Sequence, residues 1–591
     1  MLVDVNKRQN HDAVYKNTND LNSIYLLCQE YNNITEYHSP QVKDLYGCDI
    51  LMLPWICLGN KQEAFELIKS TKAQVVMSHL ELKGFQMSKN SRKKRSQILK
   101  DKGRKVTKRL KPKNDGERSN PMITAGNIHY EISKKTNATG YGGVGAIHTM
   151  VNKIGLIDEI NKDLNLLKVH LPYHESDHVL NITYNALLGG QRLEDIELRR
   201  NDISFLNALG AERLPDPTTA GDFTRRFKPE DIETLMNCIN RSREKVWSHG
   251  SSSRLKEALL DIDGSIAGTL GECKQGMDMS YKGIWGYHPL IISLANTKEV
   301  LYLVNRPGNV ASHDGAAEWL DKAIGLMEPH CERICLRGDS DFSLTAHFDK
   351  WSDKADFVFG MDAGKAFVQR AEDLEERSWS RLERPSQYEV STQQRRRPEN
   401  VKEERVKARE YKNLRLNSEE VAEFPYSPSR CKKEYRMVVL RKNLSVEKGE
   451  VVLFDDIRYF FYITTRHDLS AAGVVALANG RCDQENVIEH LKNGVNAMRM
   501  PVRDLNSNWA YMVMASLAWN LKSWLGQLMP NRARGRAIIT MEFKRFLNTM
   551  ILIPCQIVCT GRKIIYKILS YNRWLKDLFA VQEFIKQAGF T

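Results

Sequence analysis

The amino-acid sequence predicts an α/β fold built on a mixed β-sheet with flanking helices. Apolar segments typical of strands begin at Ala258, and two of them, at 288–295 and 300–305, are separated by a short turn, as in a β-hairpin. The next two, which begin at Arg333 and at Asp356 (356–362), alternate with helical patterns, one of them from Ala316 to Met327, which is typical of parallel connections. With 42% hydrophobic and 27% charged residues, the 591-residue chain is able to bury a large core.

Shifts in composition divide the chain into seven regions. The first carries apolar patches without a strong period and suggests no function. Helical patterns precede the sheet and dominate the C-terminal part. A charged, β-rich segment interrupts the sheet, and we expect it to be an insertion with a small sheet of its own. The regions are 1–88 (unassigned), 89–120 (basic linker), 121–255 (helical), 256–365 and 471–530 (two parts of the core), 366–470 (insertion) and 531–591 (basic, helical).

The chain is basic, with 87 Lys and Arg against 73 Asp and Glu. Such a balance favours a polyanionic partner, either nucleic acid or an anionic membrane surface. Much of the excess lies between Lys89 and Arg118, where 14 Lys or Arg stand against three acids. This stretch is either a solvated linker or a nonspecific nucleic-acid arm. Region 121–255, with Arg225 and Arg226 exposed after a capped helix start, is either a DNA-contact module or a plain helical scaffold.

Neither a secretory signal nor a membrane span is expected. The N-terminal residues lack an apolar signal core, and the most apolar stretch, Trp509 to Trp519, is too short to cross a bilayer. A buried helix is the better interpretation of that stretch. The eleven cysteines are scattered without a Cys-x-x-Cys pair, which favours reduced thiols and a cytoplasmic location.

Two pairs of acids lie at the ends of predicted strands. Asp261 and Asp263 alternate along one strand and therefore point to the same face, and Asp339 and Asp341 follow another strand. Carboxylates in such positions, without a Cys or His cluster nearby, suit Mg²⁺ or Mn²⁺. Alternatively, Asp339 and Asp341 only cap the helix that follows them.

A polar stripe on a later predicted helix supplies a third group of acids. Arg481, Glu485, Glu489 and Lys492 are spaced to fall on one helix face. The stripe is either a surface ladder of alternating charges or a set that converges with the two strand-end pairs. The buried side of the same helix is predicted to consist of Val487, Ile488 and Leu491.

Long motifs around these acids closely resemble DDE transposases of bacterial insertion sequences, of the thirteen-eighty group. The resemblance covers roughly residues 121–591. The motifs that carry it are Leu260-Asp-Ile-Asp-Gly-Ser, Gly271-Glu-Cys-Lys-Gln-Gly-Met-Asp-Met-Ser-Tyr-Lys-Gly-Ile-Trp-Gly-Tyr-His-Pro-Leu, Leu303-Val-Asn-Arg-Pro-Gly-Asn, Leu336-Arg-Gly-Asp-Ser-Asp-Phe, Arg481-Cys-Asp-Gln-Glu-Asn and Asn508-Trp-Ala-Tyr-Met-Val-Met-Ala-Ser-Leu-Ala-Trp.

The resemblance implies an RNase H-like core with three catalytic, metal-binding acids, which fall on Asp263, Asp339 and Glu485. Asp263 would bridge two Mg²⁺ ions, for which Mn²⁺ can substitute, and the other two acids would complete one site each. Spacing alone leaves Asp261, Asp341 and Glu489 open as alternatives.

Further residues are assigned to DNA. Arg481 and Lys492 keep the Arg and Lys spacing of a signature found in related transposases, and would hold phosphates near Glu485. Ala478 stands where that signature has Tyr. The loop between the first two strands mixes cations and aromatic residues and either grips a DNA end or packs on its own sheet. These loop residues are Lys274, Lys282, Trp285, Tyr287 and His288.

The function that the resemblance implies is DNA transposition. The protein would bind terminal inverted repeats and target DNA, form a homodimer across two ends in the nucleoid, and cut and join DNA strands. The competing hypotheses are an RNase H-like metal-dependent nuclease without strand transfer and a domesticated DNA-binding protein. The intact acids disfavour the domesticated protein.

Overall fold

The structure is a computed structural model that describes most of the chain after residue 88. The described residues are 89–110, 123, 125–132, 136–170, 172–249, 255–384, 404–405, 408–409, 412–448, 451–561 and 563–590. The unassigned region 1–88 lies outside them, as do residues 111–120 of the basic stretch.

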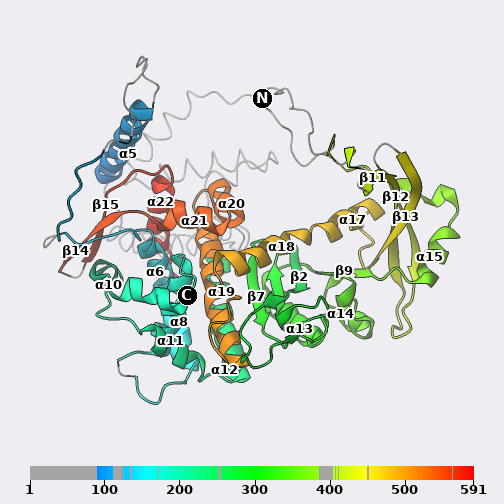
Figure 1. Ribbon diagram of the computed structural model, residues 1–591, viewed down its shortest axis with the longest axis horizontal. Coiled ribbons are helices and arrows are strands. Elements are labelled where there is room, and N and C mark those ends of the chain that lie inside the picture. Colours follow the sequence, from blue (N-terminus) through cyan, green and yellow to red (C-terminus); the bar gives the residue numbers. More distant parts are fainter. Residues whose placement is uncertain are drawn as a thin grey trace, which may run out of the picture. The chain divides into compact units, whose positions relative to one another are not determined.

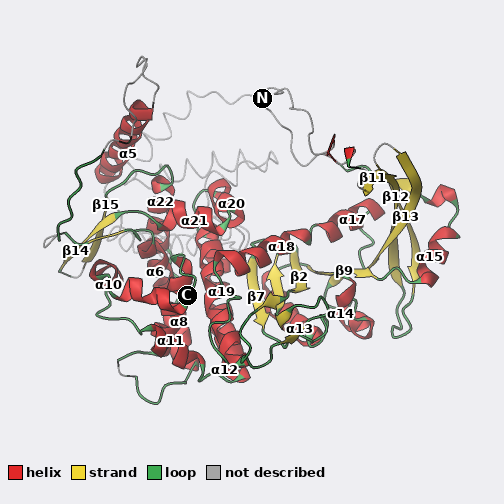
Figure 2. Ribbon diagram, viewed as in Figure 1, coloured by secondary structure: helices red, strands yellow, loops and turns green. Residues whose placement is uncertain are grey.

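A nine-stranded mixed sheet organises the protein (Figures 1 and 2). Its strands lie in the order β10-β11-β12-β13-β9-β8-β2-β6-β7. Their bounds are β2 (Ala258–Gly264), β6 (Leu290–Leu294), β7 (Glu299–Val304), β8 (Ile334–Gly338), β9 (Asp356–Met361), β10 (Ser380–Arg381), β11 (Lys412–Tyr426), β12 (Tyr435–Lys448) and β13 (Val451–Thr464).

The directions of the central strands confirm the predicted mixed sheet. On one side, β2 pairs antiparallel with β6, which forms the predicted hairpin with β7. On the other side, β2 pairs parallel with β8, and β8 pairs parallel with β9. Because β2 and β8 run in the same direction, their carboxyl ends reach the same edge of the sheet. That edge carries both strand-end pairs of acids.

The charged segment at 366–470 does not form a sheet of its own, in contrast to the prediction. Its strands β11, β12 and β13 pair antiparallel in series, and β13 pairs antiparallel with β9 over Val358–Met361. They therefore extend the central sheet. The sequence did not indicate this because strand length and alternation do not specify which edge a strand joins.

Helices surround the sheet and form a second large body of structure beside it. Their bounds are α5 (Lys89–Leu110), α6 (Val144–Lys153), α7 (Leu156–Asp163), α8 (Glu175–Leu187), α9 (Glu197–Arg200), α10 (Ile203–Leu209), α11 (Pro217–Thr224), α12 (Pro229–His249), α13 (Ala316–Met327), α14 (Phe348–Trp351), α15 (Lys365–Glu372), α17 (Ala471–Asn479), α18 (Cys482–Glu489), α19 (Leu505–Gln527), α20 (Arg532–Thr540), α21 (Phe543–Phe546) and α22 (Leu575–Gln587). Short 3-10 and π turns lie between them, including η4 (Ser340–Phe342) and the π turn η7 (His490–Gly494).

Local sequence signals explain several helix boundaries. The predicted capped start at Asp216 is confirmed, since its carboxylate accepts the backbone N–H of Thr219 at 2.9 Å and Pro217 occupies the first turn of α11. Arg225 and Arg226, which follow α11, are exposed as expected.

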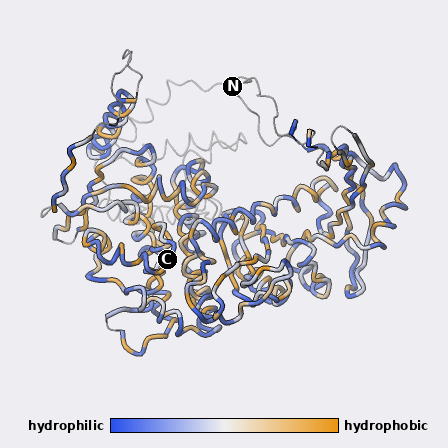
Figure 3. Tube along the Cα trace, viewed as in Figure 1, coloured by the Kyte–Doolittle hydropathy of each residue, from blue (hydrophilic) through white to orange (hydrophobic). Residues whose placement is uncertain are grey.

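The terminal regions differ from the prediction in two places. The basic stretch predicted as a linker begins with the helix α5, whose residues are mostly hydrophilic (Figure 3). Arg95 of α5 lies 4.6 Å from the ring centroid of Phe579 on α22, so the helix packs on the C-terminal region. The C-terminal region, predicted as helical, also contains a hairpin, β14 (Cys555–Thr560) and β15 (Lys563–Ile568), which pairs with β1 (Ala138–Thr139).

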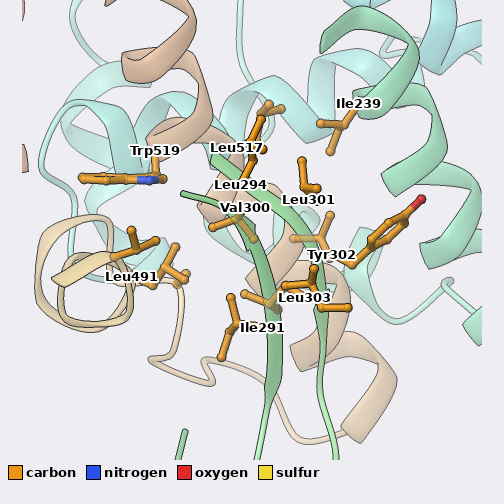
Figure 4. Packing of buried hydrophobic residues seen from close by; sticks show 14 of the residues in the cluster. Ile239, Ile291, Leu294, Val300, Leu301, Tyr302, Leu303, Leu491, Leu517 and Trp519 are labelled. Carbon is orange, nitrogen blue, oxygen red and sulfur yellow. The ribbon is translucent and has the colours of Figure 1, made fainter. Parts of the chain in front are cut away.

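The long helix α19 joins the helical body to the sheet. Residues Ser507–Gly526 are all buried, which confirms the buried helix predicted at Trp509–Trp519. Of the helices that the structure describes, none has the length and apolar character needed to cross a membrane. In Figure 4, side chains of α19 and of the π turn η7 pack against the hairpin strands β6 and β7. The labelled residues of these elements are Ile291, Leu294, Val300, Leu301, Tyr302, Leu303, Leu491, Leu517 and Trp519.

A buried carboxylate connects the sheet to α12 and α19. Glu299, the first residue of β7, is fully buried and accepts hydrogen bonds from Arg243 Nε at 3.0 Å and Trp247 Nε1 at 3.1 Å, both on α12. From α19 it accepts the indole N–H of Trp524 at 2.6 Å and the side-chain amide of Gln527 at 2.8 Å. Because donors from both helices satisfy its carboxylate oxygens, Glu299 holds the start of β7 against α12 and α19.

Glu299→Ala is expected to lower the free energy of unfolding by about 3–5 kcal/mol, because it leaves the guanidinium of Arg243 buried without its carboxylate partner. Chemical denaturation followed by tryptophan fluorescence measures the effect. Glu318→Ala is the matched control, since Glu318 is an exposed acid on α13. An unfolding midpoint for Glu299→Ala equal to that of the control would show that Glu299 does not connect the two bodies.

Candidate functional site

The register of β2 and β8 brings two of the predicted acids together. In this parallel pair, Asp261 lies opposite Arg337. Two residues after these partners stand Asp263, near the end of β2, and Asp339, directly after β8. The two acids therefore meet at the carboxyl edge of the sheet.

Helix α18 adds the third acid and a cation. Arg481 is the residue before α18, and its Nη1 lies 3.2 Å from Asp263 Oδ2 and 3.9 Å from Asp339 Oδ2. Glu485 stands in the first turn of the same helix. The guanidinium of Arg481 thus compensates the charge of two acids that come from different strands.

The acids influence one another through their charges. Burial raises the pKa of Asp263 to about 6; Arg481 opposes that rise, and the charges of Asp339 and Glu485 add to it. Burial also raises the pKa of Asp339, again against Arg481. Asp263 is therefore influenced by the charges of Asp339, Glu485 and Arg481 together.

The alternative acids are placed differently. Asp261 is fully buried and forms a two-pronged ion pair with Arg337, with N–O distances of 2.6 and 2.8 Å. Asp341 is exposed, and its backbone N–H donates to Asp339 Oδ1 at 3.1 Å. Asp339 thus caps η4 with one oxygen, as the alternative interpretation held, while its other oxygen faces Arg481. Glu489 is exposed and accepts the amide of Asn493.

The donor set of the three acids fits a hard divalent cation, since it consists of carboxylate oxygens alone. Among the described residues, the three ligand atoms found within 4.8 Å of one another belong to His170, His174 and Glu175 and not to the three acids. A pair of ions about 4 Å apart does not require all three carboxylates to meet at one point, because each ion takes only some of them.

Two buried side chains that the sequence analysis did not single out hold α18 and α17 against the sheet. Gln484, beside Glu485, donates its amide to the backbone carbonyls of Asp261 at 3.0 Å and Ile291 at 3.1 Å. Arg337 donates to Asp261 and also to the carbonyl of Leu477 at the end of α17. The spacing contained a signal for Gln484, because it precedes Val487, Ile488 and Leu491 on the buried face of the helix.

Lys492 lies on the π turn η7, close to the acids. Burial lowers its pKa, and the charges of Glu489 and Asp263 oppose that change. The ring of His490 in the same turn stacks on Trp519 of α19, with ring centroids 5.0 Å apart, which fixes the turn. Ala478 is half-buried on α17, in the same apolar cluster as Tyr462 of β13.

The predicted DNA-contact residues in the loop between β2 and β6 fall into two groups, one engaged within the protein and one exposed. Lys274 donates its ammonium to the backbone carbonyls of Met500 and, at 2.9 Å, Val502. His288 is 3% exposed and contacts the carbonyl of Val310 through Nδ1 at 2.9 Å. Both side chains are therefore engaged within the protein. Tyr287 is also buried.

The other group lies on the exposed hairpin between β4 (Asp278–Met279) and β5 (Trp285–Tyr287). Trp285 is 51% exposed, and Lys282 lies over the ring of Tyr281, 5.2 Å from its centroid. Tyr281, which the sequence analysis did not single out, is 73% exposed. The charge of Lys282 lowers the pKa of Lys492, which the charge of Asp263 raises.

Comparison with known proteins gives a family. The sequence matches a family model described as transposase DDE domain group 1 over residues 134–589. Exonuclease subunit 1 of Enterobacteria phage T4 is 40% identical over 76 residues, which are 13% of this chain, and the chain spans only 22% of that protein. A cryo-EM structure of the piggyBac transposase synaptic complex with hairpin DNA aligns over 70% of this chain and 84% of that chain, at 10% identity and a TM-score of 0.30. Because the family model covers most of its length, the chain belongs to the transposase DDE domain group 1 family.

Proposed function

We propose that this protein is the transposase of a bacterial insertion sequence of the thirteen-eighty group. It binds the terminal inverted repeats of its element, cuts the DNA there and joins the freed ends to target DNA. The observation that carries the proposal is the meeting of Asp263 and Asp339 at one edge of the sheet with Arg481 between them, in a chain of the DDE family. Glu485 stands on the exposed side of the first turn of α18, the helix that Arg481 precedes.

The catalytic core in this proposal is RNase H-like. It consists of residues 256–365 and 471–530, and residues 366–470 form an insertion that extends the sheet. The central position of β2, with an antiparallel hairpin on one side and two parallel strands on the other, supports this interpretation. Residues 121–255 would bind DNA and form the dimer, and the protein would act at the nucleoid in the cytoplasm.

Asp263, Asp339 and Glu485 would hold two divalent cations, Mg²⁺ or in its place Mn²⁺. When bound, such ions activate the attacking oxygen and stabilise the leaving oxygen of a phosphodiester. The burial of Asp263 and the mutual repulsion of the acids support cation binding, because a cation relieves both. Arg481 would then turn from the carboxylates to phosphate oxygens, for which a guanidinium is well suited.

The remaining residues of the site position the acids. Gln484 connects α18 to the backbone carbonyl of Asp261 on β2. Arg337 of β8 connects the carboxylate of Asp261 to the end of α17. A shift of even about 1 Å between catalytic groups is costly in a reaction that depends on alignment. We therefore assign positioning roles to both side chains.

DNA would approach the acids from the side of the β4–β5 hairpin. Lys282 and Trp285 remain available to a DNA end, and Tyr281 joins them. Lys274 and His288 would act indirectly, by holding the loop. Lys492 would contact phosphate between the hairpin and Glu485. Aromatic rings that stack on bases and cations that contact phosphates are typical of proteins that hold single-stranded or distorted DNA.

Asp339→Asn and Glu485→Gln are each expected to reduce cleavage of an inverted-repeat substrate at least about 1,000-fold, because several kcal/mol of charge stabilisation is lost. Binding of the same DNA should stay within about twofold, since the phosphate contacts remain. Cleavage is measured by gel analysis of end-labelled DNA, and binding by mobility shift.

Asp341→Asn is the matched control, because Asp341 is an exposed acid two residues from Asp339. It should retain cleavage. Full cleavage by Asp339→Asn would contradict the assignment of the acids. Cleaved ends without joined products from the unmodified protein would favour a nuclease over a transposase.

Trp285→Ala is expected to weaken binding of DNA with a single-stranded end by about 1–3 kcal/mol, or roughly 5- to 150-fold, because a stacking surface is lost. Fluorescence anisotropy with labelled ends measures this change. Leu270→Ala is the control, since Leu270 is a 99% exposed apolar residue of the same loop. Equal affinities for the two variants would show that the hairpin does not hold the DNA end.

A further inference from the structure

A cluster of two histidines and one glutamate lies at the start of α8. His170 and His174 belong to the segment that joins α7 to α8, and Glu175 is the first residue of α8. One potential ligand atom of each side chain lies within 4.8 Å of the other two. Nothing in the proposed transposition chemistry uses these residues.

The carboxylate of Glu175 is fixed and buried. The side chain is 1% exposed, and its Oε1 accepts the backbone N–H groups of Leu166 and Leu167 at 3.0 Å each. Burial opposes ionisation, but these two hydrogen bonds and the charge of His170 lower the pKa of Glu175 below its ordinary value. Its Oε1 is thus held by two backbone donors, and its Oε2 faces His170.

The two imidazoles lie face to face beside this carboxylate. Their ring centroids are 4.9 Å apart and the ring planes are inclined by 20°. His170 Nε2 lies 3.2 Å from Glu175 Oε2. Two imidazoles and one carboxylate in this arrangement can share a single cation.

We propose that His170, His174 and Glu175 bind one transition-metal ion of the Zn²⁺ class. Two imidazole nitrogens and one carboxylate oxygen are a ligand set that zinc accepts, whereas Mg²⁺ prefers oxygen ligands. Ligand atoms about 2.0–2.1 Å from a tetrahedral ion lie roughly 3.3 Å from one another, and the His170–Glu175 pair already has this separation. The backbone hydrogen bonds to Glu175 are the outer support that orients a ligand.

The bound ion ties the segment after α7 to the first turn of α8. Helix α8 in turn packs on α19, where the Thr183 hydroxyl donates to the carbonyl of Met514 at 2.9 Å. Both histidines are exposed, so the ion is reached directly from solvent and its fourth position is open to water. The site is independent of the three acids, and its test does not depend on transposition.

The full-length protein is stripped of metal with a chelator and titrated with Co²⁺, whose visible absorption reports tetrahedral coordination, and with Zn²⁺ in competition. We expect one ion per chain that millimolar Mg²⁺ does not displace. His170→Ala and His174→Ala should each weaken binding by roughly 100-fold or more, because a ligand is lost. Circular dichroism of the stripped proteins checks that the variants are folded. His170→Asn or His174→Asn replaces the corresponding alanine variant if that one is not.

His313→Ala, which removes an exposed histidine elsewhere, and the double variant Asp263→Asn, Glu485→Gln are the controls. Both should keep the Co²⁺ spectrum and the stoichiometry. Unchanged binding by the His170 and His174 variants, or loss of binding in the acid double variant, would place the ion elsewhere and overturn the proposal. Failure of the unmodified chain to retain one ion would overturn it as well.

Discussion

The compensation of carboxylate charge at the carboxyl edge of β2 and β8 is the constraint on which the candidate active site depends. Asp261, Asp263 and Asp339 are brought together there by the parallel pairing of the two strands. Buried or half-buried carboxylates that are close to one another repel, and they persist only with partners. Arg337 pairs with Asp261, and Arg481 lies between Asp263 and Asp339.

The two arginines differ in how fully they engage the oxygens of their carboxylate partners. The pair of Arg337 and Asp261 is buried and closed, with both carboxylate oxygens engaged, so it belongs to the scaffold. Arg481 makes a single contact with Asp263 and a longer one with Asp339, at 3.2 and 3.9 Å. Its place can therefore be taken by another cation without loss of a buried ion pair. This difference separates the acid that supports the site from the acids proposed to act in it.

Strong local patterns were sufficient to predict many elements from the sequence. The helix at Ala316–Met327 has the predicted bounds, and the strand predicted at 356–362 ends one residue earlier, at Met361, because both have regular apolar spacing and end where that pattern breaks. The buried face of α18 was predicted for the same reason. Spacing also predicted which segments would bring acids to the sheet edge, since parallel strands share that edge.

Contacts between distant segments were not predictable in this way. The sequence could not show that β13 pairs with β9, or that Lys274 donates to carbonyls more than two hundred residues away. Gln484 was overlooked because a glutamine is usually exposed, whereas here its side-chain amide donates to two backbone carbonyls on the buried face of the helix. The cluster at His170 depends on backbone hydrogen bonds to Glu175, which composition does not reveal.

The most direct measurement of the central claim is anomalous diffraction from crystals of the full chain with end DNA and Mn²⁺. The account predicts manganese peaks bounded by the carboxylates of Asp263, Asp339 and Glu485, with Asp261 still paired to Arg337. Peaks bound by Asp261, Asp341 or Glu489, with Asp263, Asp339 and Glu485 free of metal, would contradict it.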